Sequence, residues 1–420
     1  MVKIAPPTIF SYAPTSAPAS ARKVFVVNFS EKFIDRPEFM KILLVNNLYF
    51  PYQRGGAEEV NKIMKTEFES AGHSVAIISL APLGRRDFQK ESRMQNVYYL
   101  PSLFFYLCFI PVPLRFLWHL GNFLPIHWLQ IKKIISRFQP DLVVTHNLVG
   151  IGFWLPLWLR IKKIRHWHYL HDIQLLHPSG LLFYRQERKI NSFFSRCYQW
   201  LTRRFFGSPH KVISPSDWLI NLHRQKKFFP KSERIVLPPN LNLSFRIRQR
   251  FSPAEAFHFI YIGQLEKHKG IIELLEAFKK LASLPSLSRP VLLHLVGRGT
   301  YSEKIKSHPQ IITYGFLPSH KVVELLGRAD CLIVPSLCYE NYPTIIQKAL
   351  AVGCPVIASS LGGNIELLTK AHYKVGLYFP PTSQELFKKM HWAIKNIALF
   401  PVNSIQSTKR QFITLLDQEI

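Results

Sequence analysis

The sequence predicts an α/β protein with two doubly wound domains, and three observations support this fold class. Short apolar segments alternate with amphipathic helical segments along most of the chain, a pattern typical of parallel sheets covered by helices. The alternation stops near the middle of the chain and then starts again with the same strand–turn–helix plan. The length of 420 residues also favours two hydrophobic cores over one.

The first domain is expected over residues 40–238. Its short apolar segments read as strands, and the segments between them carry apolar residues at helical spacing. Residues 1–39 are expected to be a poorly ordered extension, because prolines interrupt them and leave no apolar region typical of a signal peptide. The expected strands are 41–46, 73–80, 141–146, 164–171 and 211–214, and the expected helices are 57–71, 126–138 and about 187–205.

A change in composition separates the two domains. Residues 239–255 are rich in proline, asparagine and charge, which is typical of a linker. The second domain is expected over residues 256–395, and residues 396–420 are expected to form a C-terminal helix that packs back on the first domain. The strands expected in the second domain are 257–262, 291–296, 331–334 and 355–358, with helices over 270–281 and from Pro343 to about 352.

The charge of the chain is strongly positive and uneven. Its 54 Lys and Arg residues against 26 Asp and Glu residues give +28. Residues 256–420 hold 18 basic and 11 acidic residues, so +7, which leaves +21 for residues 1–255. This balance favours an anionic partner, which could be a nucleic acid, an acidic membrane surface or a phosphorylated substrate. A solvated basic face is the alternative.

The segment SLFFYLCFIPVPLRFLW, residues 102–118, is strongly apolar and lies in an aromatic region, residues 97–131. Pro111, Pro113 and Arg115 interrupt it, so it does not reach the ~18 uninterrupted apolar residues that indicate a membrane-spanning helix. It is expected to form either a pair of core helices or a patch that lies on a bilayer.

Cysteine and histidine patterns do not indicate a metal site. The five cysteines are scattered and lack metal-ligand spacing, which fits a reducing compartment. Strand alternation places His166 and His168 on one face, so a metal site there is an alternative, but Asp172 is the only carboxylate close by in the sequence. No G-x-S-x-G sequence indicates a hydrolase nucleophile.

Several residues of the first domain are expected at the carboxyl ends of its strands, where open α/β sheets bind ligands. Gly55 and Gly56 precede the first helix and let backbone N–H groups approach an anion, or they form a simple tight turn. His146 ends one strand, and His171 and Asp172 end the next. All three are expected to face the same edge, with ordinary structural histidines as the alternative.

The second domain repeats this arrangement. Lys269 stands at a helix start, where an ammonium group can meet a phosphate beside free backbone N–H groups; a solvated lysine is the alternative. Glu340 follows the strand 331–334 and is expected at the same edge. Glu366 is either a ligand-binding residue or a partner of its own helix dipole, worth ~0.3–1 kcal/mol. Glycine turns are expected around these residues at Gly263, Gly297, Gly362 and Gly363.

The order of these motifs resembles the family 4 retaining glycosyltransferases of GT-B fold, over about residues 40–395. The motifs are GGAE after the first strand, HD midway, then GQLEKHKG, YEN…KALAVGCPVIAS and LGGNIE. The resemblance implies two Rossmann-like domains facing across a cleft, with a nucleotide-sugar held mainly by the second domain. It also implies a reaction that needs no metal and no cofactor besides the nucleotide-sugar as co-substrate.

The resemblance implies roles for individual residues as well. Lys269 would hold the donor diphosphate, and Glu340 would bind hydroxyls of the donor sugar or stabilise positive charge near its anomeric carbon. His171 would line the reaction centre, with His146 and Asp172 on the acceptor side. The residues expected to bind the donor are Gly55, Gly56, Gly263, Gln264, Lys269, Gly297, Glu340, Asn341, Tyr342, Lys348, Gly362, Gly363 and Glu366.

Two positions depart from the family pattern. Gln264 stands where an arginine is usual, and Lys348 stands where a second glutamate is usual, eight residues after Glu340. That glutamate would accept hydrogen bonds from ribose hydroxyls, which an ammonium group cannot do because it has no acceptor. The hypothesis is that Lys348 reaches a phosphate. The alternatives are that it turns to solvent or that it indicates weakened activity.

The resemblance therefore predicts a metal-independent, retaining, hexosyl-type glycosyltransferase. Its acceptor is expected to be a membrane-presented glycan or a lipid-linked molecule, in the synthesis of a cell-envelope polysaccharide or glycolipid. The basic first half is expected to dock on an anionic membrane from the cytoplasm. The alternatives are a weakened relative that binds a ligand without turnover, a nucleic-acid-binding protein, which we do not favour, and a GT-B phosphorylase with a lysine-bound pyridoxal cofactor.

Overall fold

The computed structural model describes most of the chain from Phe39 onward, and residues 39–420 form one compact unit. The described residues are 39–52, 55–84, 96–241, 251, 255–287, 289–303, 305, 308–401 and 411–417. Apart from Phe39, the expected N-terminal extension lies outside the described residues, and so does most of the expected linker.

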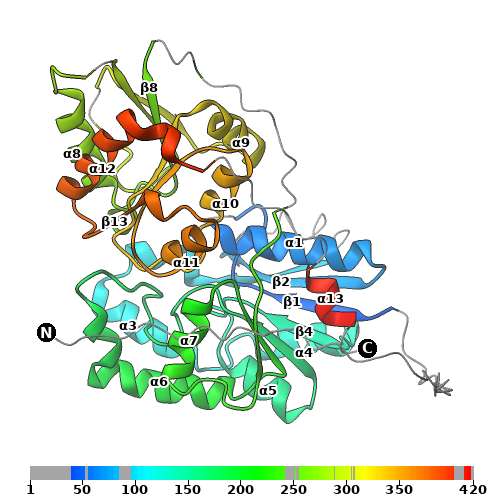
Figure 1. The fold of residues 1–420 in the computed structure, drawn as a ribbon. Helices are drawn as coiled ribbons and strands as arrows, with labels where there is room; N and C mark the ends of the chain where they lie inside the picture. The colour runs from blue at the N-terminus through cyan, green and yellow to red at the C-terminus, as the bar shows by residue number, and fades with distance from the viewer. Residues whose placement is uncertain are drawn as a thin grey trace, which may run out of the picture. The chain divides into compact units, whose positions relative to one another are not determined.

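The first half is built on a seven-stranded parallel sheet with the order β3-β2-β1-β4-β5-β6-β7 (Figure 1). Its strands are β1 (Lys41–Val45), β2 (Ser74–Pro82), β3 (Val97–Ser102), β4 (Leu142–Thr145), β5 (Arg165–Tyr169), β6 (Lys211–Ser214) and β7 (Glu233–Val236). Its helices are α1 (Gly56–Ser70), α3 (Val112–Gly121), α4 (Trp128–Phe138), α5 (Trp154–Ile161), α6 (Phe193–Phe206) and α7 (Asp217–Gln225). The strands β3 and β7 and the helices α5 and α7 were not among the expected elements.

The second half has a six-stranded parallel sheet with the order β10-β9-β8-β11-β12-β13. Its strands are β8 (Phe257–Ile262), β9 (Val291–Val296), β10 (Ile311–Gly315), β11 (Cys331–Val334), β12 (Val356–Ser359) and β13 (Leu377–Tyr378). Its helices are α8 (Ile271–Ala282), α9 (Ser319–Arg328), α10 (Thr344–Ala351), α11 (Gly363–Lys370) and α12 (Ser383–Asn396). The prediction of two doubly wound α/β domains is confirmed.

Buried apolar residues cover both faces of the first sheet. In β1, Leu43 and Val45 belong to one hydrophobic cluster, whereas Ile42 and Leu44 belong to another on the opposite face. This alternation follows from the period of two along a strand, and it is why the strand sequence KILLV is apolar at nearly every position. A third cluster forms the core of the second half.

The C-terminal helix α13 (Gln411–Asp417) packs against α1 in the first half (Figure 1). The backbone N–H of Phe412 donates to Glu67 Oε2 at 3.0 Å, and Lys211 Nζ donates to the carbonyl of Leu415 at 3.2 Å. The side chains of Phe412 and Leu416 are fully buried. A segment far along the sequence thus completes the core of the first half.

One local prediction was wrong in detail. The helix expected over 187–205 is divided, because a 3₁₀ turn (Glu187–Asn191) ends before Ser192, whose side chain caps α6 by accepting from Ser195 N–H. The segment 102–118 forms a 3₁₀ helix (Leu103–Phe109) followed by α3. Among the described residues, no helix is long and apolar enough to cross a membrane.

Candidate functional site

A partly buried lysine–glutamate pair lies beyond the carboxyl end of β11. Lys269 Nζ is 2.7 Å from Glu340 Oε1, and Ser336 Oγ donates to the same oxygen at 2.7 Å. Burial alone would raise the pKa of Glu340, but the charge of Lys269 and these hydrogen bonds outweigh it, so that the pKa falls below its ordinary value. Burial likewise opposes the charged form of Lys269, and the negative charge of Glu340 nevertheless raises the pKa of the ammonium group.

Gly270 allows Lys269 to approach this site. It has φ +74°, and a Cβ atom there would lie 1.9 Å from the carbonyl oxygen of Pro335, just beyond β11. Only glycine fits this position, because any side chain would clash with the backbone of the neighbouring loop. The turn therefore brings the loops after β8 and β11 into direct contact and places Lys269 beside Glu340.

The predicted glycines mainly pack these loops against each other. A Cβ atom at Gly297 would lie 1.8 Å from the carbonyl oxygen of Gly263, and one at Gly363 would lie 1.5 Å from that of Asn341. The N–H of Gly363 donates to the carbonyl of Glu340 at 2.7 Å. Gly362 has φ +54° at the start of α11. Close packing of backbone on backbone is thus sufficient to explain glycine at Gly297 and Gly363.

Glu366 caps a helix of the other half of the molecule. Its carboxylate accepts hydrogen bonds from the N–H groups of Asp217 and Trp218, both at 3.0 Å, in the first turn of α7. It also lies 2.7 Å from Lys370. A carboxylate at a helix N-terminus is stabilising because it meets unpaired N–H groups and the positive end of the dipole. The charge of Glu366 therefore interacts favourably with the positive end of the dipole of α7, a helix in the first half.

The loop that carries Glu340 also contacts the first half. Asn341 Oδ1 accepts from Ser216 Oγ at 2.6 Å, and Asn341 Nδ2 donates to the carbonyl of His171 at 3.1 Å. The ring of Tyr339 stacks on that of Trp218, with centroids 5.8 Å apart. Neither Ser216 nor Trp218 was a candidate, because nothing in the sequence links them to residues more than 100 positions away. Tyr342 is half-buried, and its hydroxyl contacts Gln347 Nε2 at 3.4 Å.

His146 and His171 form a pair at the carboxyl ends of β4 and β5. His146 Nδ1 is 2.8 Å from His171 Nε2, and the rings stack with centroids 5.1 Å apart. Burial lowers the pKa of both imidazoles, so both are neutral near pH 7. Asp172 lies beside them, and burial raises its pKa to about 6 although its carboxylate accepts from the N–H of Gln174.

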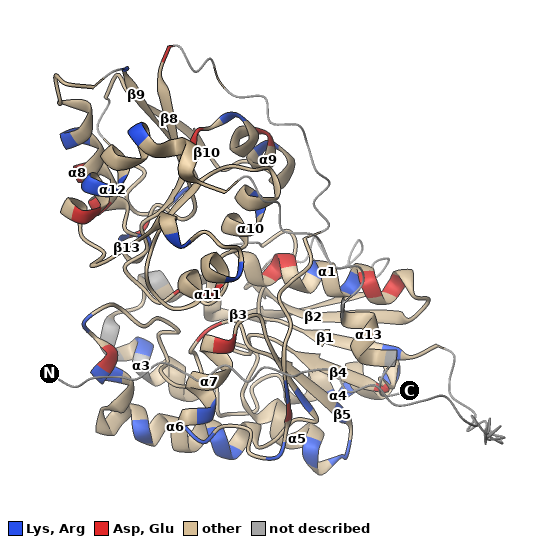
Figure 2. Ribbon diagram, viewed as in Figure 1, with Lys and Arg blue, Asp and Glu red and all other residues tan. Residues whose placement is uncertain are grey.

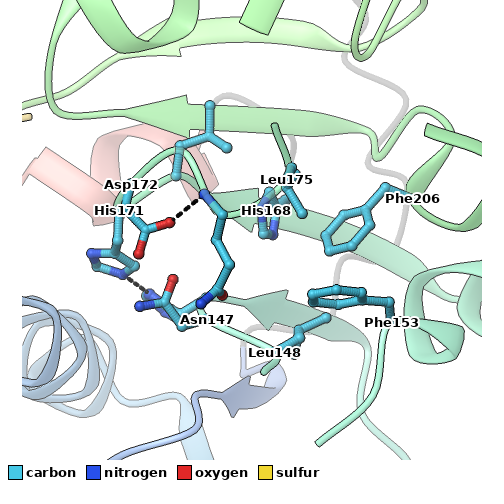
Figure 3. A pocket seen from close by; sticks show the side chains of 11 residues that line it. Asn147, Leu148, Phe153, His168, His171, Asp172, Leu175 and Phe206 are labelled. Carbon is cyan, nitrogen blue, oxygen red and sulfur yellow. Dashed lines mark hydrogen bonds between the residues drawn. The ribbon is translucent and has the colours of Figure 1, made fainter. Parts of the chain in front are cut away.

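These residues line a small cavity of about 10 Å³, room for about one water molecule (Figure 3). Phe153, Leu175 and Phe206 form its apolar side, and His171 and Asp172 lie on its polar side (Figure 3). The structure thus brings His146, His171 and Asp172 together, as the strand ends predicted. His146 Nε2 is buried and has no hydrogen-bond partner among the residues that the structure describes.

His166 and His168 are core residues. Both are buried, and the hydroxyl of Thr145 lies between them, 2.7 Å from His166 Nε2 and 2.9 Å from His168 Nδ1. This geometry supports the structural interpretation of the two histidines. Within the part of the chain that the structure describes, no group of three or more His, Cys, Asp and Glu side chains could hold a metal ion.

Lys348 has a partner that none of the three sequence-based alternatives included. Its ammonium group lies 2.8 Å from Glu59 Oε1 and 3.1 Å from Ser319 Oγ, and the residue is only 7% exposed. The alternative that it turns to solvent is therefore wrong. Glu59 belongs to α1 and lies three residues after Gly56, so this ion pair joins the first half to α10 of the second.

The remaining donor-side candidates also lie near these contacts. Gly55 N–H donates to Glu58 Oε2 at 2.8 Å, and a Cβ atom at Gly56 would meet the side chain of Thr344 at 3.5 Å. The N-termini of α1 and α10 therefore lie against each other, which brings the two predicted glycines to the second half. The carbonyl of Gln264 accepts from the hydroxyl of Tyr261 at 2.6 Å in the loop after β8.

Two family models match the chain. The model described as glycosyl transferases group 1 matches residues 245–409, and that described as glycosyltransferase family 4 matches residues 54–245. A similar protein is an uncharacterized 42.6 kDa protein in the cps region of Klebsiella pneumoniae, 26% identical over 78% of this chain and 87% of the relative. Another is the putative teichuronic acid biosynthesis glycosyltransferase TuaC of Bacillus subtilis, 30% identical over 44% of this chain and 46% of the relative.

Solved structures share the fold. Sucrose-phosphate synthase from Thermosynechococcus elongatus aligns with a TM-score of 0.65 and 17% identity, over 86% of this chain and 90% of that chain. Anabaena HepE in complex with UDP-glucose aligns with a TM-score of 0.61 and 17% identity, over 90% of this chain and 98% of that chain.

Proposed function

The chain belongs to the group 1 glycosyltransferases, and from this premise we propose that it is a retaining enzyme that moves a hexose from a nucleotide-sugar to a glycan or lipid-linked acceptor. The observation that carries the proposal is the Lys269–Glu340 pair at the carboxyl edge of the second sheet. It places a cation and a carboxylate where open α/β sheets bind their ligands. The UDP-glucose in the HepE structure makes UDP the first nucleotide to test.

In this proposal the protein acts chiefly through electrostatics. The bond between the anomeric carbon and the diphosphate oxygen breaks, and its electron pair stays with the diphosphate. Lys269 stabilises that developing charge, and it does so more strongly in a desolvated site than it would in water. Glu340 accepts hydrogen bonds from the sugar hydroxyls. No metal or cofactor is assigned a part.

The acceptor hydroxyl attacks the anomeric carbon on the face that the diphosphate leaves, and its proton passes to the departing phosphate oxygen. We assign no carboxylate as nucleophile, since a double displacement would require one placed on the opposite face of the sugar. The neutral His171, beside His146 and Asp172, lines the acceptor side of this centre. Its low pKa keeps it uncharged while the acceptor approaches.

Glu59 is the residue that we assign to the nucleoside. In the family pattern a glutamate at the position of Lys348 accepts from the ribose hydroxyls, and here the carboxylate of Glu59 lies 2.8 Å from Lys348 Nζ. A carboxylate is thus present beside this position although it comes from α1. Because an ionised carboxylate has about four lone-pair sites, Glu59 can keep its ion pair and still accept from a hydroxyl.

We also propose that the first half docks on an anionic membrane that presents the acceptor. Leu114 and Leu117 on α3 and Ile126 after it are 52%, 59% and 67% exposed, and Lys132 and Lys133 on α4 follow closely in the sequence. Exposed apolar side chains close to cations favour an interface with acidic lipids. A pelleting assay with acidic vesicles at low salt tests this, and a protein that stays in the supernatant would remove the proposal.

Calorimetric titration with UDP, GDP and ADP tests the enzymatic proposal. Micromolar binding of one nucleotide is expected, with a large loss of affinity in Lys269→Gln. The control is Lys267→Gln, because Lys267 lies in the same turn but is exposed. No binding by the folded protein would refute a donor site. Binding of a nucleotide-sugar without transfer to any acceptor or to water would favour the weakened relative that Gln264 and Lys348 suggest.

A further inference from the structure

A second pocket lies at the opposite edge of the first sheet from the strand ends that carry the candidate site. It has a volume of about 270 Å³ and is formed where β5 and β6 begin. It is lined by residues from α5 and the turn after it, the start of β5, the end of α6 and the loop between α6 and β6: Pro156, Arg160, Lys163, Ile164, His166, Phe206, Ser208, Pro209 and His210. Nothing in the proposed transfer reaction uses this pocket.

The lining of this pocket combines cations with no acid. Its charged or ionisable side chains are Arg160, Lys163, His166 and His210. The two sequence segments that build it, 142–171 and 188–216, contain no Asp or Glu residue at all. Figure 2 shows the Lys and Arg residues on α5 and α6, the helices that lie within these segments. Glu233 on β7 neighbours His210 but does not line the pocket, and its carboxylate lies 3.6 Å from Lys211 Nζ. The lining cations therefore still produce a positive potential that an anion can neutralise.

Arg160 is held in place without a carboxylate. Its Nη2 donates to the carbonyl of Arg204 at 3.2 Å, which is its only acceptor among the residues that the structure describes. Gly207 has φ +61°, and a Cβ atom there would lie 1.5 Å from Arg160 Nη1. The guanidinium group therefore packs directly on the glycine backbone. Of its five N–H donors, most remain available to a ligand.

His210 adds a hydrogen-bond donor to the pocket. His210 Nδ1 accepts from the backbone N–H of His166 at 3.1 Å, so the proton of the neutral ring resides on Nε2, which is free to donate. Burial, with smaller electrostatic contributions from His210 and Arg160, lowers the pKa of His166 to about 3. An excess of positive charge therefore surrounds the buried imidazole.

We propose that this pocket binds a phosphate group. A guanidinium fork suits phosphate oxygens because it offers paired N–H groups, and Lys163 adds a point charge on the same wall. The volume is just below the range of about 300–1,000 Å³ of drug-sized sites, so it suits a phosphate, a diphosphate or a small headgroup. The source of the phosphate is either a soluble anion or a phospholipid headgroup.

The test compares Arg160→Gln/Lys163→Gln with Lys279→Gln/Arg328→Gln, which removes one exposed lysine of α8 and one exposed arginine of α9, outside the proposed membrane-docking surface. Both are made in a Lys269→Gln background so that the donor site contributes little phosphate binding. Calorimetry with inorganic phosphate and pyrophosphate is expected to show at least about tenfold weaker binding in the pocket variant only, equivalent to about 1.4 kcal/mol. Equal affinities in the two variants, or no binding in their shared background, would overturn the proposal.

Vesicles distinguish the two sources. Phosphatidylcholine vesicles with and without phosphatidic acid are pelleted with the same variants. A headgroup ligand is supported if phosphatidic acid increases binding, if free phosphate competes and if the pocket variant alone loses the increase. A soluble anion is supported if phosphate binds in calorimetry while both variants pellet equally. Thermal unfolding of each variant verifies that it is folded.

Discussion

Two partly buried lysine–glutamate pairs among the described residues have the same chemistry but different origins. Lys269 and Glu340 lie in loops of one sheet, 2.7 Å apart, and share Ser336. Lys348 and Glu59 lie 2.8 Å apart but come from different halves, and Ser319 is their third partner. The first pair is assembled by adjacent strand ends of one domain. The second exists only because α1 and α10 meet, so it reports on how the two halves pack.

The largest expected effect concerns the first pair. Lys269→Gln removes the cation assigned to the leaving diphosphate, so we expect kcat/KM for sugar transfer to fall by about 10²–10³-fold, as when a preorganised electrostatic donor is removed. Steady-state kinetics with the nucleotide-sugar found by calorimetry measures this. Lys267→Gln is the matched control and should stay within about twofold of the unmodified protein. A similar loss in both variants would mean that the lysine acts through overall charge.

The second pair is expected to matter for stability. Lys348→Glu places two carboxylates against each other in a buried site, so the free energy of unfolding should fall by roughly 1–3 kcal/mol. The swap Glu59→Lys/Lys348→Glu should recover at least half of this loss. The control is Lys65→Glu beside Glu69, an exposed pair on α1, for which we expect about 0.5 kcal/mol. If the swap recovers nothing in denaturant unfolding, the two side chains do not act as a pair.

The first pair also predicts a dependence of stability on pH. Burial opposes the ionised form of Glu340, but Lys269 lowers the pKa of its carboxylate below the ordinary value of 4.5 in the folded protein. A carboxylate with a lowered pKa adds stability above its unfolded pKa and loses it as the pH falls through the folded pKa. Glu340→Gln should therefore reduce the slope of stability against pH below about pH 4.5. Unchanged slopes in acid unfolding would contradict the pairing.

A smaller effect tests whether Glu59 reaches the ribose. In the unmodified protein, UDP should bind several-fold more tightly than 2′,3′-dideoxy-UDP, because each charged hydrogen bond contributes about 1.5–3 kcal/mol before competing costs. In Glu59→Gln this preference should nearly vanish. Glu69→Gln, on the same helix, serves as control and should keep it. A preference that survives Glu59→Gln would show that another residue binds the ribose.

The smallest effect concerns the contact between α11 and α7. Glu366→Gln keeps an acceptor for the N–H groups of Asp217 and Trp218 but removes the charge, so we expect a loss of about 0.3–1 kcal/mol that salt diminishes. Thermal unfolding at low and high salt measures it. Glu324→Gln, exposed on α9, is the control and should have no effect beyond about 0.5 kcal/mol. A loss that salt does not change would mean that the dipole is not involved.

The sequence predicted the central strands better than the edges. The strands β1, β4, β8 and β11 are nearly continuous apolar runs because helices cover both faces of each sheet. β7 was missed because it is an edge strand whose sequence ERIV is half polar and exposed at its start. α7 was missed because its helical signals, the cap of Ser216 and an apolar face, are short and surrounded by charge.

The candidate residues that the sequence placed at the correct edge of each sheet all lie near the ends of strands. His146, His171, Lys269 and Glu340 each follow a buried strand or its turn, and parallel strands place their carboxyl ends on one edge. Local chain geometry is enough for that inference. Ser216 and Trp218 were missed, because their partners Asn341 and Glu366 are more than 120 positions away along the chain.

The sequence alone determined the α/β class, the division into two domains and the strand-end position of Lys269 and Glu340, because hydrophobic period and glycine turns act over a few residues. Only the tertiary structure decided the partners of Lys348 and Glu366 and the cationic pocket around Arg160. These contacts depend on which helices and loops pack against each other in the folded protein. Lys348 and Glu59 are 289 residues apart, and nothing in the sequence near either one indicates that they form an ion pair.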